Sequence, residues 1–200
     1  MKFAAALLAL SGLASAADVA NSTAQSFADL GDGVYTVPVV NGTLHYAGAT
    51  LDDASSTSPS VSARGPNRPP GKCDPHFPTR KTTCRPRDII RADYLKAYDK
   101  FLDWIANGPE DGWIGHNQCK TILSGTAAVM ACSLAGKQPT CAEELTEAMT
   151  ELDTYCAEDE GGDLKIQRWA KVYSRHNVRD GDGLKHFLAQ DDDVTVQQTE

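Results

Sequence analysis

Two stretches of the chain carry apolar residues at the spacing of an α-helix. The first lies between residues 88 and 106, where the apolar positions are Ile90, Tyr94, Ala97, Phe101 and Ile105. Asp88 or Asp93 can cap this helix, and Gly108-Pro109 ends it, because glycine accepts a left-handed cap and proline cannot continue a helix. The second lies between residues 140 and 156, with Leu145, Ala148, Met149, Leu152 and Cys156 on one stripe. The pattern therefore predicts two amphipathic helices.

The second helix also carries a start signal and a polar face. Thr140 and Glu143 have the spacing of a capping box, which places the first turn at this point. The face opposite the apolar stripe consists of Glu144, Glu147, Glu151 and Asp153. Because runs of like charge on a helix usually face water, we expect these acidic side chains to be solvated.

Alternating apolar and polar positions predict strands at residues 112–123, 125–134 and 164–175. In the middle strand, Val129 and Ala131 should face one side of the sheet, and Met130 and Cys132 the other. In the last strand, Trp169 and Tyr173 should share a side. The predicted fold class is α+β: a small disulfide-stapled sandwich of two helices on an antiparallel or mixed sheet, with strand, helix and strand in the C-terminal half.

The N-terminal part differs in composition from this domain. Residues 1–16, MKFAAALLALSGLASA, have the charge, apolar run and small-residue end of a secretory signal peptide, so we expect a secreted, extracellular protein. Residues 17–71 are interpreted as a flexible N-terminal region or pro-segment, 72–178 as the folded domain and 179–200 as an acidic flexible tail. No later stretch reaches the length of about 20 apolar residues that a transmembrane helix needs.

Within the N-terminal region, Asn41-Gly42 between β-prone flanks predicts a hairpin, which Pro38 would confine to a sheet edge. This hairpin is either part of a pro-segment or an edge ribbon of the domain. Asn21 and Asn41 each begin an N-x-Thr or N-x-Ser acceptor pattern for glycosylation.

The six cysteines are interpreted as disulfide-bonded, as an even number in a secreted chain indicates. They are Cys73, Cys84, Cys119, Cys132, Cys141 and Cys156. Cys141 and Cys156 would lie about 22 Å apart at the two ends of one helix, so they cannot pair with each other. Among the remaining pairings we favour Cys132 with Cys156 or Cys141.

Other chemistry has weaker signals. Zinc could be held by His116 and Cys119 with Cys73 and His76, but structural zinc sites usually leave no surplus, and this set leaves cysteines over, among them Cys132, Cys141 and Cys156. The chain has no C-x-x-C redox motif and no G-x-S-x-G nucleophile elbow. His176 could act with Glu110 or Asp111 in acid-base catalysis; otherwise it is a surface histidine at a strand end. We expect no cofactor and no metal.

Charge limits the partners. A net charge of −8 argues against general binding to nucleic acid and to anionic membranes. Basic residues nevertheless gather in one run: Arg64, Arg68, Lys72, Arg80, Lys81, Arg85, Arg87 and Arg91. This run is interpreted as a solvated linker, although it could bind an acidic polysaccharide, phospholipid or protein, and Arg80-Lys81 could mark a processing site.

Several segments resemble a group of small secreted cysteine-containing proteins of filamentous fungi. They are DGVYTVPVVNGT at residues 32–43, GTAAVMAC at 125–132, PTCAEE at 139–144, DTYC at 153–156 and GGDLKIQRWAKVYSR at 161–175. More loosely, the order of elements is similar to the α/β sandwich of smut killer toxins and related fungal effector candidates. Trp104-Ile105 stand where that group often has a cysteine, and no cysteine follows the last strand.

The resemblance implies a non-enzymatic effector that acts outside the fungal cell on a host component. Its partners would be a host or competitor protein, a cell-wall glycan or a membrane component. The alternatives are a killer-toxin-like antimicrobial protein and a small secreted hydrolase or hydrolase inhibitor.

Overall fold

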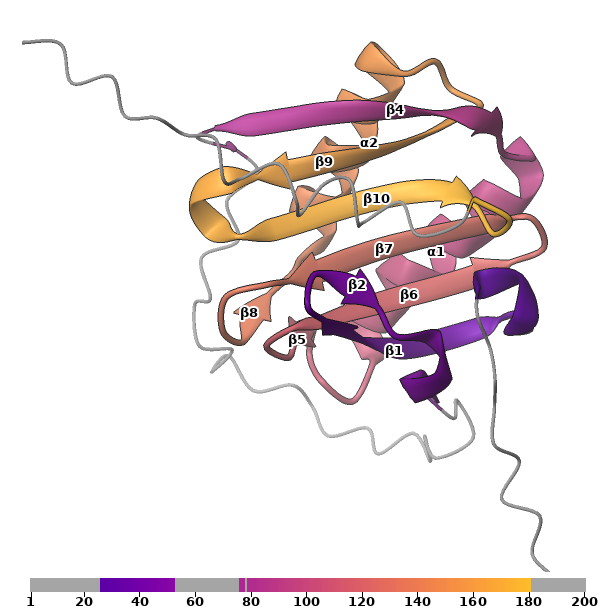
Figure 1. Ribbon diagram of the computed structural model, residues 1–200. Helices are drawn as coiled ribbons and strands as arrows, with labels where there is room; N and C mark the ends of the chain where they lie inside the picture. Colours follow the sequence, from indigo (N-terminus) through magenta and orange to yellow (C-terminus); the bar gives the residue numbers. More distant parts are fainter. Residues whose placement is uncertain (1–25, 53–75, 78, 181–200) are drawn as a thin grey trace, which may run out of the picture.

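A curled antiparallel sheet organises the described part of the chain, which in this computed structural model comprises residues 26–52, 76–77 and 79–180 (Figure 1). The strands follow the order β2-β1-β6-β7-β10-β9-β4, and β3 also pairs with β1. Their bounds are β1 (Gly33–Val40), β2 (Thr43–Leu44), β3 (Thr50–Leu51), β4 (Arg80–Asp88), β6 (Gln118–Ser124), β7 (Ala127–Ser133), β9 (Glu160–Ile166) and β10 (Lys171–Asn177). Two short strands, β5 (Trp113–Ile114) and β8 (Gln138–Pro139), form a separate ribbon.

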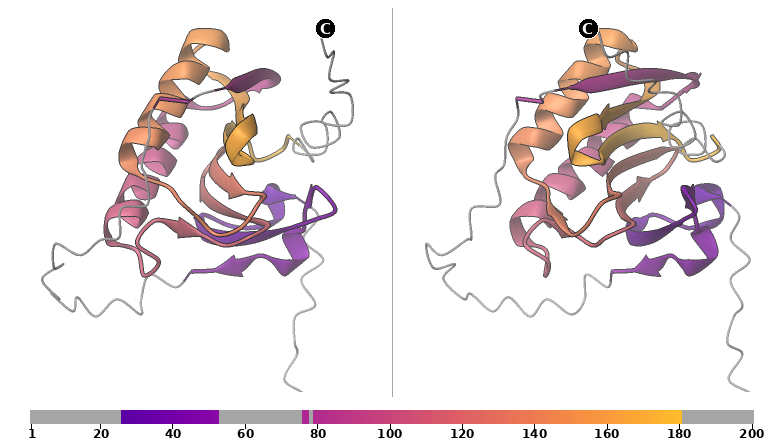
Figure 2. Two further views of the ribbon diagram at one scale, coloured as in Figure 1. Left: turned by 90° about the vertical axis from the view of Figure 1, so that its left-hand side faces the viewer. Right: turned by 60° about the vertical axis from the view of Figure 1, so that its left-hand side comes forward.

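Both helices lie on the same side of this sheet (Figure 2). They are α1 (Arg91–Asn107) and α2 (Ala142–Tyr155). The Tyr98 hydroxyl of α1 hydrogen-bonds the Thr146 hydroxyl of α2 at 2.8 Å, which links the two helices directly. The predicted α+β class with two helices is therefore confirmed, and every strand pair among the described residues is antiparallel.

Each face of the sheet has its own apolar core. Val129 and Ala131 of β7 point to the helix side, where they join Phe101 of α1 and Leu145 of α2. Met130 and Cys132 point to the other side. There they pack with residues of the N-terminal part: Phe27, Tyr35, Val37, Val39, Leu44 and Tyr46. The predicted alternation along β7 is confirmed.

The N-terminal hairpin belongs to this sheet. Asn41 and Gly42 have φ angles of 49° and 73°, as a two-residue hairpin turn with both central residues left-handed requires. β1 continues the sheet beside β6, with Val37 opposite Cys119. The edge-ribbon interpretation is therefore the one observed, and the expected domain start at residue 72 is wrong, because residues 26–52 supply strands and core to the domain.

Two helix starts differ from the predicted caps. Ile90, not Asp88 or Asp93, is the N-cap of α1. Cys141 caps α2 with its sulfur, which accepts the Glu144 N–H, so the predicted Thr140 capping box is wrong. Thr140 instead hydrogen-bonds the Tyr173 hydroxyl at 2.7 Å. The Thr140 side chain therefore takes part in a contact between α2 and the sheet instead of capping the helix.

The segment 164–175 is not one strand but the hairpin of β9 and β10. The short 3-10 turn η4 (Gln167–Trp169) and Ala170, with a φ of 48°, reverse the chain between them. The turn residues 167–170, QRWA, include no glycine, proline, asparagine or aspartate, so no turn signal interrupts the alternation of apolar and polar residues in this segment. Trp169 and Tyr173 still share an aromatic neighbour, Phe77.

The acidic face of α2 is mostly not solvated, contrary to expectation. Glu144 and Glu151 are buried, and Asp153 is half-buried. Glu151 pairs with Arg80 at 2.9 Å, and Asp153 pairs with Arg175. These carboxylates therefore attach α2 to the strands beneath it. Neither α1 nor α2 combines the length and hydropathy of a membrane span, and the other described helices do not either.

Candidate functional site

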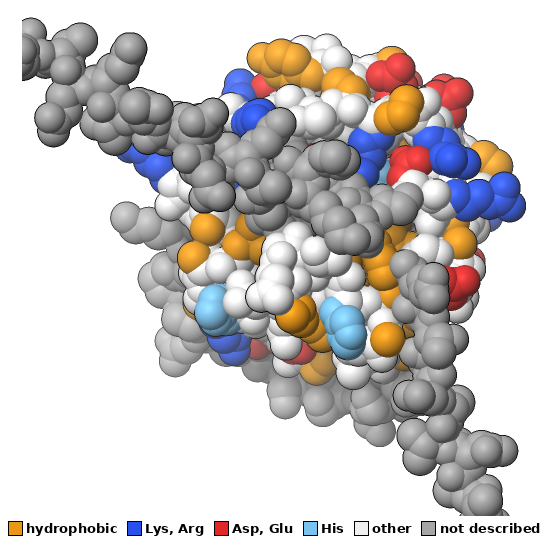
Figure 3. Space-filling model, in the orientation of Figure 1, with side chains coloured by type: hydrophobic (Ala, Val, Ile, Leu, Met, Phe, Trp, Pro, Cys, Tyr) orange, Lys and Arg blue, Asp and Glu red, His pale blue; other side chains and the backbone are white. Residues whose placement is uncertain are grey.

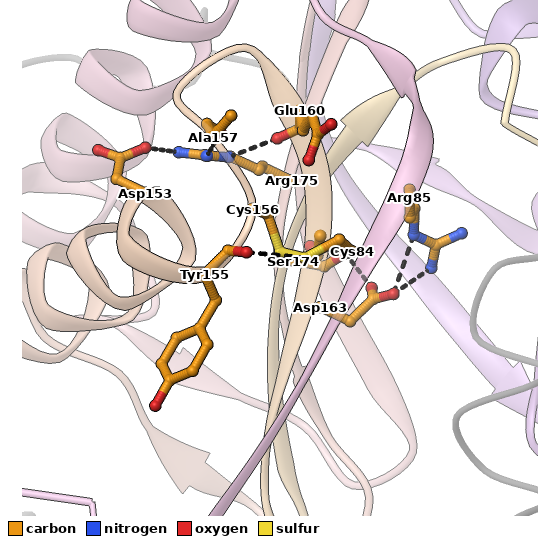
Figure 4. Close-up of a disulfide and its surroundings, with 11 residues drawn as sticks. Cys84, Arg85, Asp153, Tyr155, Cys156, Ala157, Glu160, Asp163, Ser174 and Arg175 are labelled. Carbon is orange, nitrogen blue, oxygen red and sulfur yellow. Dashed lines mark hydrogen bonds and ion pairs between the residues drawn. A yellow bond between two sulfur atoms is a disulfide. The ribbon is translucent and has the colours of Figure 1, made fainter.

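Two disulfides hold the sheet at different places. Cys84 of β4 is bonded to Cys156 at the end of α2 (Figure 4). Cys119 of β6 is bonded to Cys132 of β7. Cys141 is also disulfide-bonded, and Cys73 lies outside the described residues. Cys141 and Cys156 are not bonded to each other, as the helix geometry predicted.

The favoured partners of Cys132 are wrong. Cys132 faces away from the helices and lies directly opposite Cys119, with the two Cα atoms 4.0 Å apart. Cys156 lies on the helix side of the sheet. A residue on one face of a strand cannot reach the layer that covers the other face.

Half of the basic run forms the strand β4. Arg80, Lys81, Arg85 and Arg87 lie on this strand, so the linker interpretation is wrong for residues 80–88. Arg87 pairs with Asp180 at 2.8 Å. Of the remaining members, Arg91 begins α1, and Arg64, Arg68 and Lys72 lie outside the described residues. β4 therefore presents a basic strand at the edge of an acidic protein.

A buried polar cluster fixes β4 against β9 and β10. Arg85 donates to one carboxylate oxygen of Asp163 from Nε at 2.9 Å and from Nη2 at 2.6 Å, and the Ser174 hydroxyl donates to the other at 2.5 Å (Figure 4). Burial raises the pKa of Asp163 above its ordinary value, although Arg85 and Ser174 act in the opposite direction. The cluster gives three neighbouring strands one shared set of bonds.

His176 belongs to this cluster rather than to the surface. Its Nδ1 lies 3.1 Å from the Ser174 oxygen, its ring lies 5.4 Å from the Phe27 ring, and 3% of the residue is exposed. Burial, helped by the positive charge of Arg85, lowers the pKa of His176 to about 3. Both expectations for His176 are therefore wrong: it is not a surface residue, and Glu110, its suggested partner, pairs with Lys120 at 2.7 Å.

Asp163, Ser174 and His176 lie together here, but their hydrogen bonds run differently from those of a catalytic triad. In a catalytic triad the imidazole accepts the serine proton and the carboxylate holds the imidazole. Here the Ser174 hydroxyl donates to Asp163, and its oxygen is left to accept from the Nδ1–H of His176. Ser174 is also fully buried. The arrangement stabilises strand register and does not present a nucleophile.

A second buried cluster joins α2 to β10. Lys171 and the Tyr173 hydroxyl both donate to one carboxylate oxygen of Glu144, and Lys171 also donates to the Pro139 carbonyl. Burial lowers the pKa of Lys171 and, together with the negative charge of Glu144, raises that of Tyr173 well above its ordinary value. Sequence reasoning missed this cluster because Glu144 looked like a member of a solvated acidic face.

Arg175 clamps the loop that follows α2. Its guanidinium donates to Asp153, to the Ala157 carbonyl at 2.9 Å and to the Glu160 carbonyl at 3.0 Å (Figure 4). It also lies 5.1 Å from the centre of the Tyr94 ring. These bonds hold the segment next to Cys156, and so support the disulfide to β4.

The other predicted sites have different outcomes. Cys119 is disulfide-bonded, so it cannot supply the thiolate of the suggested zinc site, and the described residues contain no cluster of three metal-ligating side chains. Asn41 lies at the exposed β1–β2 turn, where its side chain is open to solvent. Asn21 lies outside the described residues.

No protein-family model, curated protein or solved structure matches this chain.

Proposed function

We propose that this chain is a secreted, non-enzymatic effector-type protein that binds a host component outside the fungal cell. The signal-like N-terminus and the disulfides support an extracellular site of action. The fungal resemblance supports the effector role.

One observation carries the binding role. β4 is an exposed basic strand at the sheet edge, and it is fixed in place by the Cys84–Cys156 disulfide and by the Arg85–Asp163 ion pair. By contrast, Ser174 and His176, the side chains with hydrolytic chemistry, are buried in a structural cluster. A rigid, charged edge suits recognition of a partner more than turnover of a substrate.

A killer-toxin-like antimicrobial protein is the second candidate. The layer of two helices on one face of the sheet favours the α/β sandwich of the resemblance, and with it this role. A toxin would arrest the growth of sensitive fungal cells in the absence of any host.

Affinity capture from host extracellular fluid tests the proposal. The oxidised protein should retain one defined host component, and Lys81→Glu on β4 should weaken this capture. Lys96→Glu, at an exposed position of α1, is the matched control and should leave the capture unchanged. Growth arrest of fungal cells, or cleavage of RNA, glycan or peptide panels by the wild-type protein, would contradict the proposal.

A further inference from the structure

Within the described residues, one side of the β4 backbone has no strand partner. β4 is the last strand of the sheet and pairs only with β9 among the described strands (Figure 1). At one end of this pair, the Gln167 N–H donates to the Thr79 carbonyl at 3.3 Å, and at the other the Ile89 N–H donates to the Asp159 carbonyl at 2.8 Å. These two bonds fix which positions of β4 face β9.

Hydrogen-bonded positions alternate along an antiparallel pair. Counting from Thr79, the positions that bond to β9 are Lys81, Thr83 and Arg85. The N–H and C=O groups that point away from the sheet therefore belong to Arg80, Thr82 and Cys84. Such a row is a template on which another extended chain can add a strand.

The open edge has a defined end. The register shifts between Arg85 and Asp88, where a bulge interrupts the pairing, and Pro86 in this bulge has no N–H to offer. Arg80 and Cys84 are exposed and Thr82 between them is half-buried, so all three outward positions before the bulge lie at least partly at the surface. The open template therefore runs from Arg80 to Cys84.

Charge selects the occupant of this edge. Within the strand, β4 carries four basic residues and one acidic residue; Arg80 and Arg87 pair with Glu151 and Asp180 of other elements, yet their side chains are still 39% and 52% exposed. Figure 3 shows Lys and Arg side chains on this upper part of the molecule. A second copy of β4 would place like charges opposite each other, which is destabilising, whereas an acidic strand would be attracted.

An exposed aromatic residue lies beside the same edge. The Tyr155 side chain extends away from the disulfide, and Tyr155 is 63% exposed (Figure 4). Its carbonyl oxygen lies 3.4 Å from Cys84 Sγ, which places α2's last residue next to the open backbone. An added strand would find apolar contact area here in addition to main-chain hydrogen bonds.

We infer that the edge of β4 from Arg80 to Cys84 binds an extended acidic segment of a partner protein as an additional strand. This inference rests on the proposed function and names the kind of partner segment. Main-chain bonds supply affinity, and the basic side chains supply the preference for acidic sequence.

A short synthetic peptide of alternating glutamate and threonine tests the inference on the oxidised full chain. Its binding, followed by NMR, should protect the amides of Arg80, Thr82 and Cys84 from hydrogen exchange. A peptide with lysine in place of glutamate should not bind. The glutamate peptide methylated on alternate backbone nitrogens should also lose binding, because it lacks donors for one edge.

Thr82→Pro removes an outward N–H without removing a bond to β9, and edge strands tolerate proline in that position. It should weaken peptide binding about tenfold, whereas Thr82→Ala, which keeps the N–H, should not. If Thr82→Pro does not fold, the test is the wild-type protein alone: the bound peptide must protect the amides of Arg80, Thr82 and Cys84 from hydrogen exchange.

The inference is overturned if the glutamate peptide does not bind at about 1 mM, or if it binds and protects amides elsewhere. A host component captured equally by wild-type and Thr82→Pro protein would also overturn it while leaving the proposed function standing. Peptide binding at β4 without capture of any host component would instead contradict the proposed function alone.

Discussion

Glu144 of α2 accepts a hydrogen bond from the Tyr173 hydroxyl of β10 at 2.5 Å, in the interior between helix and sheet. The same carboxylate oxygen is bonded by Lys171, so one helix residue satisfies two buried donors of one strand. The cluster therefore ties α2 to β10 through charge as well as packing.

Removal of this carboxylate should destabilise the protein strongly. Glu144→Ala leaves the buried Lys171 ammonium without its counter-charge, and we expect a loss of about 3–5 kcal/mol in the free energy of unfolding. The double variant Glu144→Leu with Lys171→Met should recover most of it, because no buried charge remains. Urea unfolding of the two variants measures the difference; equal losses would contradict the buried-pair explanation.

Stability should fall on acidification because of His176. Its pKa is about 3 in the folded protein against 6.5 ordinarily, so below pH 6.5 the unfolded chain binds a proton that the folded chain excludes. The loss should amount to about 2–3 kcal/mol between pH 6.5 and 4.5 and should be absent above pH 7.

The raised pKa of Asp163 acts in the opposite direction, since the folded protein gains that proton more readily than the unfolded chain. His176→Asn keeps a donor for Ser174 but does not titrate. Chemical denaturation of wild-type and variant protein across this pH range should therefore give a smaller pH dependence for the variant; parallel curves would exclude His176 as the cause.

The two described disulfides should differ in their contribution. The Cys84–Cys156 bond closes a separation of 72 residues and the Cys119–Cys132 bond one of 13. The loop-entropy relation gives about 4 kcal/mol for the first and about 3 kcal/mol for the second. Paired Cys→Ala variants, compared by guanidinium unfolding, should show this order. The reverse order would mean that core packing around Cys119 outweighs chain entropy.

Arg175→Lys should loosen the loop after α2. A lysine can keep the ion pair with Asp153 but cannot also reach the carbonyls of Ala157 and Glu160, which the planar guanidinium bonds together. We expect a loss of about 1–3 kcal/mol. Hydrogen exchange should quicken at residues 157–160 and stay unchanged in α1; unchanged exchange in the loop would show that Arg175 is not its clamp.

Periodicity predicted the parts of the fold that depend on local burial. Both helices follow from the helical spacing of their apolar residues, and the two faces of β7 follow from the alternation of side chains along a strand, although every residue of β7 is buried. The division between β9 and β10 was missed, because the alternation of apolar and polar residues continues through the turn that separates them. The left-handed residue of this turn is Ala170 and not the glycine that usually marks such a position in a sequence.

The candidate site was harder to predict because its chemistry depends on pairs far apart in sequence. Arg85 and Asp163 meet only because β4 lies beside β9, and Glu144 and Tyr173 only because α2 packs on β10. A run of acidic residues on a helix and a run of basic residues before it both look solvated until the sheet order is known. Thr82 and Thr83 inside the basic run are β-prone, and this is a signal that could have indicated a strand there.

The strand order also bears on how the chain is made. β1 and β4 come early in the sequence, yet each lies toward an opposite edge of the sheet, while the strands between them, β6, β7, β10 and β9, come later. During synthesis, β4 must wait for about 80 further residues before β9 emerges to pair with it. Until then, these early strands could pair with strands of other chains. The charged arginines of β4 oppose such pairing, because like charges on two copies of the strand repel each other.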